Sequence, residues 1–140
     1  MRSWPRDAGT VVLISLDPGE DVLGSLEAAC RDHDIRDGVV LSGIGTLDRC
    51  RLHCVTTTGY PPQETYPEWR DEPLELVSMA GTIIGGAPHV HMTIANISGA
   101  WGGHLEPGSR VLYLAEIAIM KLSGPELRRA PDDSGVDRLR

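Results

Sequence analysis

The order of hydrophobic and polar positions changes once along the chain, from a short helical region to a long region of strands. Residues 10–16 form an apolar stretch that predicts a strand, and Asp-Pro-Gly at 17–19 supplies turn residues after it. Over residues 20–35 the apolar side chains recur at helical spacing. They fall on one face at Val22, Leu23, Leu26, Ala29 and Cys30. We therefore expect one main helix near the N-terminus.

From residue 39 onward the pattern is typical of strands. Residues 39–59 predict two strands joined at Leu47 to Arg49, and the second alternates cleanly, as a half-buried strand does. The proline-rich residues 60–73 predict a loop or a long hairpin arm. The remaining expected elements are strands at 74–86, with a break at Gly81, at 89–97 and at 110–120, and a glycine-rich connection at 98–109.

One helix followed by about six strands predicts an α+β domain with a mostly antiparallel sheet. A chain of 140 residues suits a single domain, which we place at residues 10–121. Residues 1–9 then form an N-terminal extension and residues 122–140 a polar, flexible tail. There is neither an apolar run of membrane-spanning length nor an apolar signal segment, so we expect a cytoplasmic protein without membrane contact.

The charge balance disfavours binding to nucleic acid. The formal net charge is −7 and Lys121 is the only lysine, whereas affinity for DNA comes largely from neutralising phosphates. The arginines are dispersed apart from the pair at Arg128 and Arg129. The charge balance does not exclude a local basic face in an oligomer.

Cysteine and glycine spacings point to structural roles. The three cysteines include no CxxC pair, and Cys50 and Cys54 on one strand would lie about 13 Å apart, too far for a disulfide. We therefore expect the cysteines to be small buried side chains. The glycines of "SGIGTL" and "GTIIGG" do not match the phosphate-binding loop pattern, so we expect strand bends or close strand approaches.

The strongest chemical signal is the histidine group of residues 88–105. His89 and His91 share one face of a strand, with bases about 6.5–7 Å apart, while Val90 and its alternate neighbours point into the core. His104 follows a turn, a possible return strand and the pair Gly102–Gly103, which lets backbones approach closely. Three imidazoles can hold one metal ion and leave zinc's fourth position open, as in catalytic sites.

Ordinary histidines on a solvated sheet face remain an alternative on spacing alone. His33 and His53 show no such pattern, and we expect both at the surface. Two glutamates interrupt apolar strands, Glu75 and Glu116. Glu75 can simply face water. Glu116 has apolar neighbours on its own face, so it is a candidate to orient a ligand imidazole or transfer protons, or else a core carboxylate paired with backbone or arginine.

Five stretches together resemble the PPC domain, the plants and prokaryotes conserved domain. They are "LSGIGTLDRCRL", "PLELVSMAGTI", "PHVHMTIAN", "GAWGGHLEPGSRV" and "AEIAI", and the resemblance covers residues 10–120. It implies an α+β subunit assembled as a homotrimer. It also implies that His89, His91 and His104 bind a metal, expected to be Zn²⁺, near subunit boundaries, where a neighbouring chain can complete the site.

The chain departs from plant members of that family because it has no "RGRP" AT-hook, whose arginines enter the minor groove. If the protein is an enzyme, we expect a small anionic or carbonyl ligand at the open metal position, with Glu75 or Glu116 as candidate catalytic groups. The alternatives are a regulatory or protein-interaction module and a DNA-associated protein without an AT-hook. Imidazole also binds copper, iron and nickel, so the sequence does not determine which metal is bound.

Overall fold

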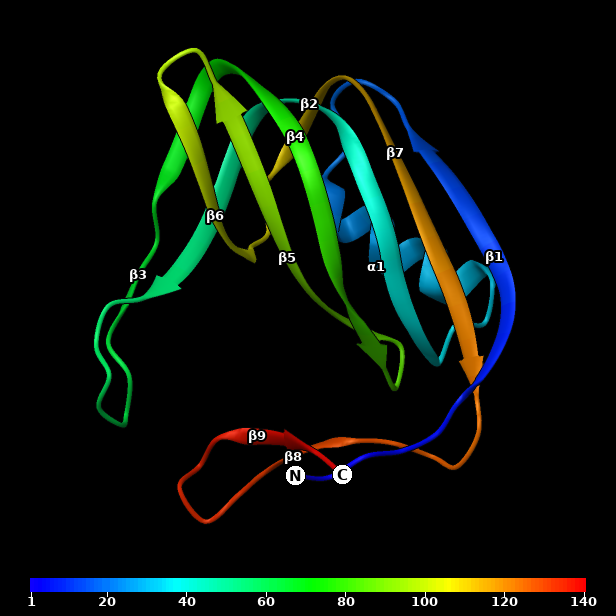
Figure 1. Ribbon diagram of the computed structural model, residues 1–140. Coiled ribbons are helices and arrows are strands. Elements are labelled where there is room, and N and C mark those ends of the chain that lie inside the picture. Colours follow the sequence, from blue (N-terminus) through cyan, green and yellow to red (C-terminus); the bar gives the residue numbers. More distant parts are fainter.

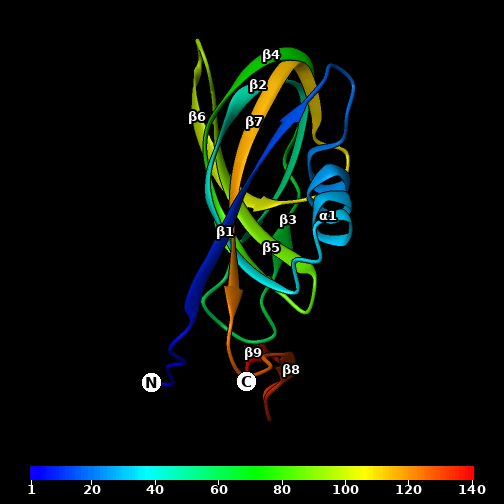
Figure 2. The same ribbon diagram turned by 90° about the vertical axis from the view of Figure 1, so that its right-hand side faces the viewer.

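A single curved sheet forms the body of the protein, and one helix packs against one of its faces (Figures 1 and 2). The structure is a computed structural model that describes residues 1–140. The helix is α1 (Val22–Asp32). The strands are β1 (Asp7–Leu16), β2 (Asp37–Val55), β3 (Glu64–Thr65), β4 (Glu68–Ile84), β5 (Ala87–Asn96), β6 (Gly99–Leu105), β7 (Arg110–Ser123), β8 (Arg129–Pro131) and β9 (Asp137–Leu139). The expected α+β class and the mostly antiparallel sheet are confirmed.

The main sheet has the order β1-β7-β2-β4-β5-β6, and all its pairings are antiparallel. The strand β2 is long enough to pair with β4 and β7 and, at its far end, with β6. There Leu52 lies opposite Leu105 and His53 opposite His104. This pairing closes β2, β4, β5 and β6 into a ring, which brings the first half of the chain against the histidine region.

The prediction of two strands over residues 39–59 was wrong, because β2 runs through them without a turn. At Leu47 to Arg49 the register shifts against both β4 and β7. A bulge adds a residue and bends a strand without ending it, so its sequence signature resembles that of a tight connection.

Two segments expected to be connections contain strands. Residues 60–73 were predicted as a loop or a long hairpin arm, and they contain β3 and the start of β4 at Glu68. The strand β6 occupies most of the predicted connection 98–109, at the place of the possible return strand before His104. Backbone pairing with β5 and β2 forms β6 in spite of its glycines. At the C-terminus, within residues 122–140, β7 continues to Ser123 and β8 and β9 form a hairpin.

The core lies between α1 and the inner face of the sheet. Asp21 caps the helix, since its side chain accepts a hydrogen bond of 2.9 Å from the Gly24 N–H. The helix then buries Val22, Leu26, Ala29 and Cys30. On β5 the core residues are Val90, Met92 and Ile94, as predicted, so His89 and His91 lie on the outer face of the sheet. None of the helices is long and apolar enough to cross a membrane.

We predict that Gly81→Ala destabilises the fold by about 1–3 kcal/mol, as overpacking typically does. A methyl group at Gly81 would lie 2.7 Å from the Val90 Cα atom and against the His89 carbonyl oxygen, so β5 must move. Urea unfolding measures the change in the free energy of unfolding. The control is Gly59→Ala, where no atom lies within 4 Å of the added carbon. Equal stability of both variants would contradict the close approach of β4 and β5.

Candidate functional site

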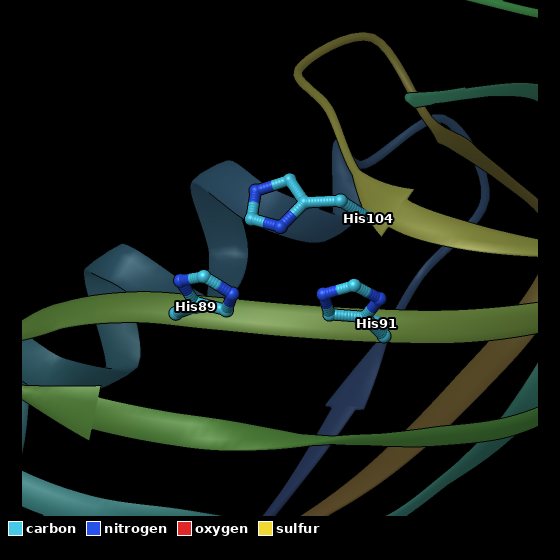
Figure 3. Close-up of side chains that lie close together, drawn as sticks. All are labelled: His89, His91 and His104. Carbon is cyan, nitrogen blue, oxygen red and sulfur yellow. The ribbon is translucent and has the colours of Figure 1, made fainter. Parts of the chain in front are cut away.

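The structure brings His89, His91 and His104 together on the outer face of the sheet. Figure 3 shows His89 and His91 side by side on β5, with His104 reaching toward them from β6. The ring centroids are 5.6 Å apart for His89 and His91, 4.8 Å for His89 and His104, and 5.2 Å for His91 and His104. One ring nitrogen of each lies within 4.8 Å of the others, so the three can act as ligands to one ion.

A close approach of backbones positions His104. His91 lies directly opposite His104 in the pairing of β5 with β6. Beside it, a side chain at Gly103 would place its Cβ atom 2.8 Å from the His53 carbonyl oxygen on β2. The predicted role of this glycine is confirmed. At Gly102 the nearest atom would be 3.5 Å away, which is ordinary contact.

Burial and neighbouring positive charge lower the pKa of two of these histidines. Burial lowers the pKa of His104 to about 4, helped by the nearby His53, His89 and His91. Burial also lowers the pKa of His89, and Arg129 is the next cause. A neutral imidazole is the form that binds metal, because protonation occupies the ligand nitrogen. Near neutral pH, no proton therefore competes with an ion for His104.

His53 extends the cluster, so the prediction that it is an ordinary surface residue was wrong. Its ring stacks on that of His104, with centroids 4.5 Å apart, and its Nδ1 lies 2.6 Å from Glu106 Oε1. His53, His104 and Glu106 form a second group whose ligand atoms lie within 4.8 Å of one another. The two groups share His104, so a single imidazole belongs to both.

The sequence held a partial signal for this extension. Glu106 follows His104 at a spacing of two, and His53 alternates with core positions on β2. The missing information was the pairing of β2 with β6, which no local pattern reveals. In contrast, His33 lies exposed just after α1, as predicted.

Neither candidate glutamate lies beside the histidines within one chain. Glu116 is exposed on β7, and two strands, β2 and β4, separate it from β5, a distance of about 14 Å at the usual strand spacing. Glu75 is exposed on β4 opposite Ala95, four residues along β5 from His91, or about 13 Å. Glu75 instead lines a surface cavity of about 560 Å³ at the other end of β4 and β5.

The cysteines take no part in the cluster. All three are free, and Cys30 and Cys50 are buried in the core, as predicted for small apolar residues. The prediction was wrong for Cys54, which is only partly buried and whose thiol donates to the Gly102 carbonyl oxygen over 3.4 Å. Burial raises the pKa of the Cys50 thiol to about 12, so it stays protonated. The donors available at the site are therefore imidazole nitrogens and one carboxylate.

Comparison with known families identifies most of the chain as a known domain. The family model of the Plants and Prokaryotes Conserved (PCC) domain matches residues 5–123. The chain belongs to this family. The resemblance to the PPC domain seen in the sequence is confirmed, and the matched region ends where β7 ends.

Solved structures share the fold across almost the whole chain. A plant- and prokaryote-conserved (PPC) protein from Pyrococcus horikoshii is 25% identical, with a TM-score of 0.79 over 98% of this chain and 95% of that chain. The metal-containing protein AF0104 from Archaeoglobus fulgidus is 23% identical, with a TM-score of 0.80 over 96% of this chain and 95% of that one.

Among curated proteins, the bifunctional protein GlmU of a Synechococcus strain is 34% identical over 122 residues, which is 85% of this chain but 18% of that protein. A second Synechococcus GlmU gives a similar match, covering 20% of its length. The chain thus spans about a fifth of the curated relatives that it matches.

We predict that the metal-free protein loses stability as the pH falls from about 6.5 toward 4, and that His104→Gln loses less. The folded state holds the pKa of His104 at about 4, whereas an unfolded histidine titrates near 6.5. In that window the unfolded chain binds the extra proton, so stability rises with pH. Urea unfolding at several pH values measures the slope of the free energy of unfolding against pH. Equal slopes for wild type and variant would contradict the lowered pKa.

Proposed function

We propose that this protein is a cytoplasmic, homotrimeric member of the PPC family that binds one Zn²⁺ ion per chain through His89, His91 and His104. The observation that carries the proposal is the convergence of three imidazoles from two neighbouring strands on one exposed point. The chain supplies no fourth ligand to this group, and an open position is typical of zinc sites that bind ligands.

The arrangement of the donors fits the size of the ion. Ligand nitrogens at about 2.0–2.1 Å from a tetrahedral zinc lie about 3.3 Å from one another. The nitrogens here lie within 4.8 Å, so modest rotation of the rings reaches that geometry. His89 and His91 are exposed at the surface of the sheet, so no core packing fixes their rings. A protein of the same fold from Archaeoglobus fulgidus is metal-containing, which agrees with a metal site in this fold.

His53 and Glu106 contribute to the site by holding the ring of His104 in place. The hydrogen bond of His53 to Glu106 fixes the His53 ring, which stacks on His104 and limits its rotation. The chemistry that zinc supplies when bound is that of a Lewis acid, which polarises an oxygen atom of the ligand. The exposed outer side of His89 and His91 leaves room for a small anionic or carbonyl ligand.

The outer face of the sheet also supports self-association. Apolar side chains from β1, β2 and β7 stand exposed there, with Leu13 79%, Ile44 53% and Leu114 48% accessible. Glu116 lies among them, opposite Ile44 and Ser15. Exposed apolar groups of this kind mark interaction surfaces, and we infer that a second copy of the chain covers them. The histidines lie on this same face, three strands away from β7, so a neighbouring chain that extends beyond the apolar side chains can reach them.

Binding to a different protein is the second candidate function, since this apolar surface also suits another partner. DNA binding has less support, because the net charge of −7 and the apolar character of the outer face both oppose contact with phosphates.

We predict about one zinc per chain in tag-free wild-type protein and none in His91→Ala, as measured by mass spectrometry of metal content. His53→Ala and the control His33→Ala, at an exposed site away from the cluster, should retain the metal. Loss of zinc from His53→Ala with retention in His91→Ala would place the ion in the group of His53, His104 and Glu106. Absence of zinc from wild type, even after zinc is supplied, would contradict the proposal.

We predict that Ile44→Glu converts the trimer to monomers, because three negative charges would be buried in the apolar contact. Light scattering after size exclusion gives the mass. The control is Glu27→Lys on the exposed side of α1, which should leave the assembly unchanged. A wild-type protein that is monomeric at all concentrations would contradict the assembly without affecting the metal proposal.

A further inference from the structure

The C-terminal hairpin lies beyond the region matched by the family model and next to the histidine group. Its strands β8 and β9 lie below the end of the sheet where β4 joins β5, as both views show (Figures 1 and 2). Hydrogen bonds of 2.9 and 2.8 Å between the backbones of Arg128 and Arg140 close the hairpin. Leu127, just before β8, is buried and anchors the segment.

This hairpin places Arg129 beside His89. The Arg129 Nη2 donates a hydrogen bond of 2.8 Å to Thr82 Oγ1 on β4. Thr82 lies directly opposite His89 in the pairing of β4 with β5. Side chains at such positions point the same way, with Cβ atoms about 4.5–5.5 Å apart.

The guanidinium of Arg129 has no carboxylate partner. The ion pairs of other half-buried arginines join Arg6 to Asp37 and Arg110 to Asp48. No ion pair of the chain includes Arg129, and its Nε is buried without a hydrogen-bond partner. A partly buried charge without a counter-ion costs free energy unless a ligand of opposite charge binds to it.

The histidine group has no free carboxylate that could serve as the counter-ion of Arg129. Its nearest carboxylate, Glu106, is 2.6 Å from His53 and so is already engaged. Since Nη2 already donates to Thr82 and Nε is buried, a small anion at the histidine group would accept from the remaining Nη hydrogens on one side and lie beside the imidazoles on the other. Guanidinium groups bind carboxylates and phosphates with two parallel hydrogen bonds, which makes arginine a selective receptor for an oxyanion.

We propose that Arg129 recognises an oxyanion, a carboxylate or a phosphate group, of the ligand that binds at the three-histidine site. This inference rests on the proposed zinc site and narrows its ligand from anionic or carbonyl compounds to anionic ones. Arg129 is then a specificity residue carried by a segment outside the family's common domain, and its neighbour Arg128 is exposed and serves as the matched control.

The test is calorimetric titration of zinc-loaded, tag-free protein with inorganic phosphate and, separately, with acetate. We expect Arg129→Gln to weaken binding of at least one anion about tenfold or more, because a charge-assisted hydrogen-bond pair is lost. Arg128→Gln removes the same charge one residue away and should leave both affinities unchanged. Thr82→Val keeps every charge and frees the guanidinium from its anchor, so it should weaken binding in the same direction even if Arg129→Gln disturbs the hairpin.

Zinc content is measured for every protein before titration, which separates the two proposals. A loss confined to phosphate, or to acetate, supports the inference and identifies the oxyanion. Full zinc content with equal anion affinity in wild type, Arg129→Gln and Thr82→Val would overturn the role of Arg129 and leave the metal site standing. Zinc-loaded wild type that binds neither anion would overturn it too, and wild type without zinc would overturn both proposals.

Discussion

The pairing of the far end of β2 with β6 is the constraint on which the rest of the histidine cluster depends. The strand has to stay continuous from Asp37 to Val55, through the register shift at Leu47 to Arg49, to reach β6. Only then do His53 and Glu106 meet and the His53 ring come to lie on His104. A turn in place of the bulge would leave β6 paired with β5 alone and His104 without support.

The same pairing sets the electrostatic character of the cluster. Crowding of β2, β5 and β6 withdraws His104 from water, and this burial is the main reason for its low pKa. Desolvation disfavours the charged imidazolium and leaves the nitrogen lone pair available. The fold thus keeps His104 neutral near neutral pH, while Arg129, on a separate segment, adds to the lowering of the His89 pKa.

Local pattern predicted the parts of the structure that local physics determines. The period of α1, the alternation on β5 and the convergence of His89 with His91 all follow from side-chain spacing within one element. The start of β4, the strand character of β6 and the continuity of β2 depend on partners distant in sequence, so proline and glycine were misleading there. Glu116 looked buried because its neighbours are apolar, yet in the single chain all of them face outward.

The position of Arg129 separates the residues proposed to hold the metal from the residue proposed to select its ligand. The sheet of the family domain carries the three histidines and the core, whereas Arg129 lies on a C-terminal hairpin that buries little of its own besides Leu127. The two strands of that hairpin pair only with each other, in a sheet separate from the main one. On the proposed role of Arg129, exchange of this short terminal segment changes the preferred ligand without altering a pairing of the main sheet.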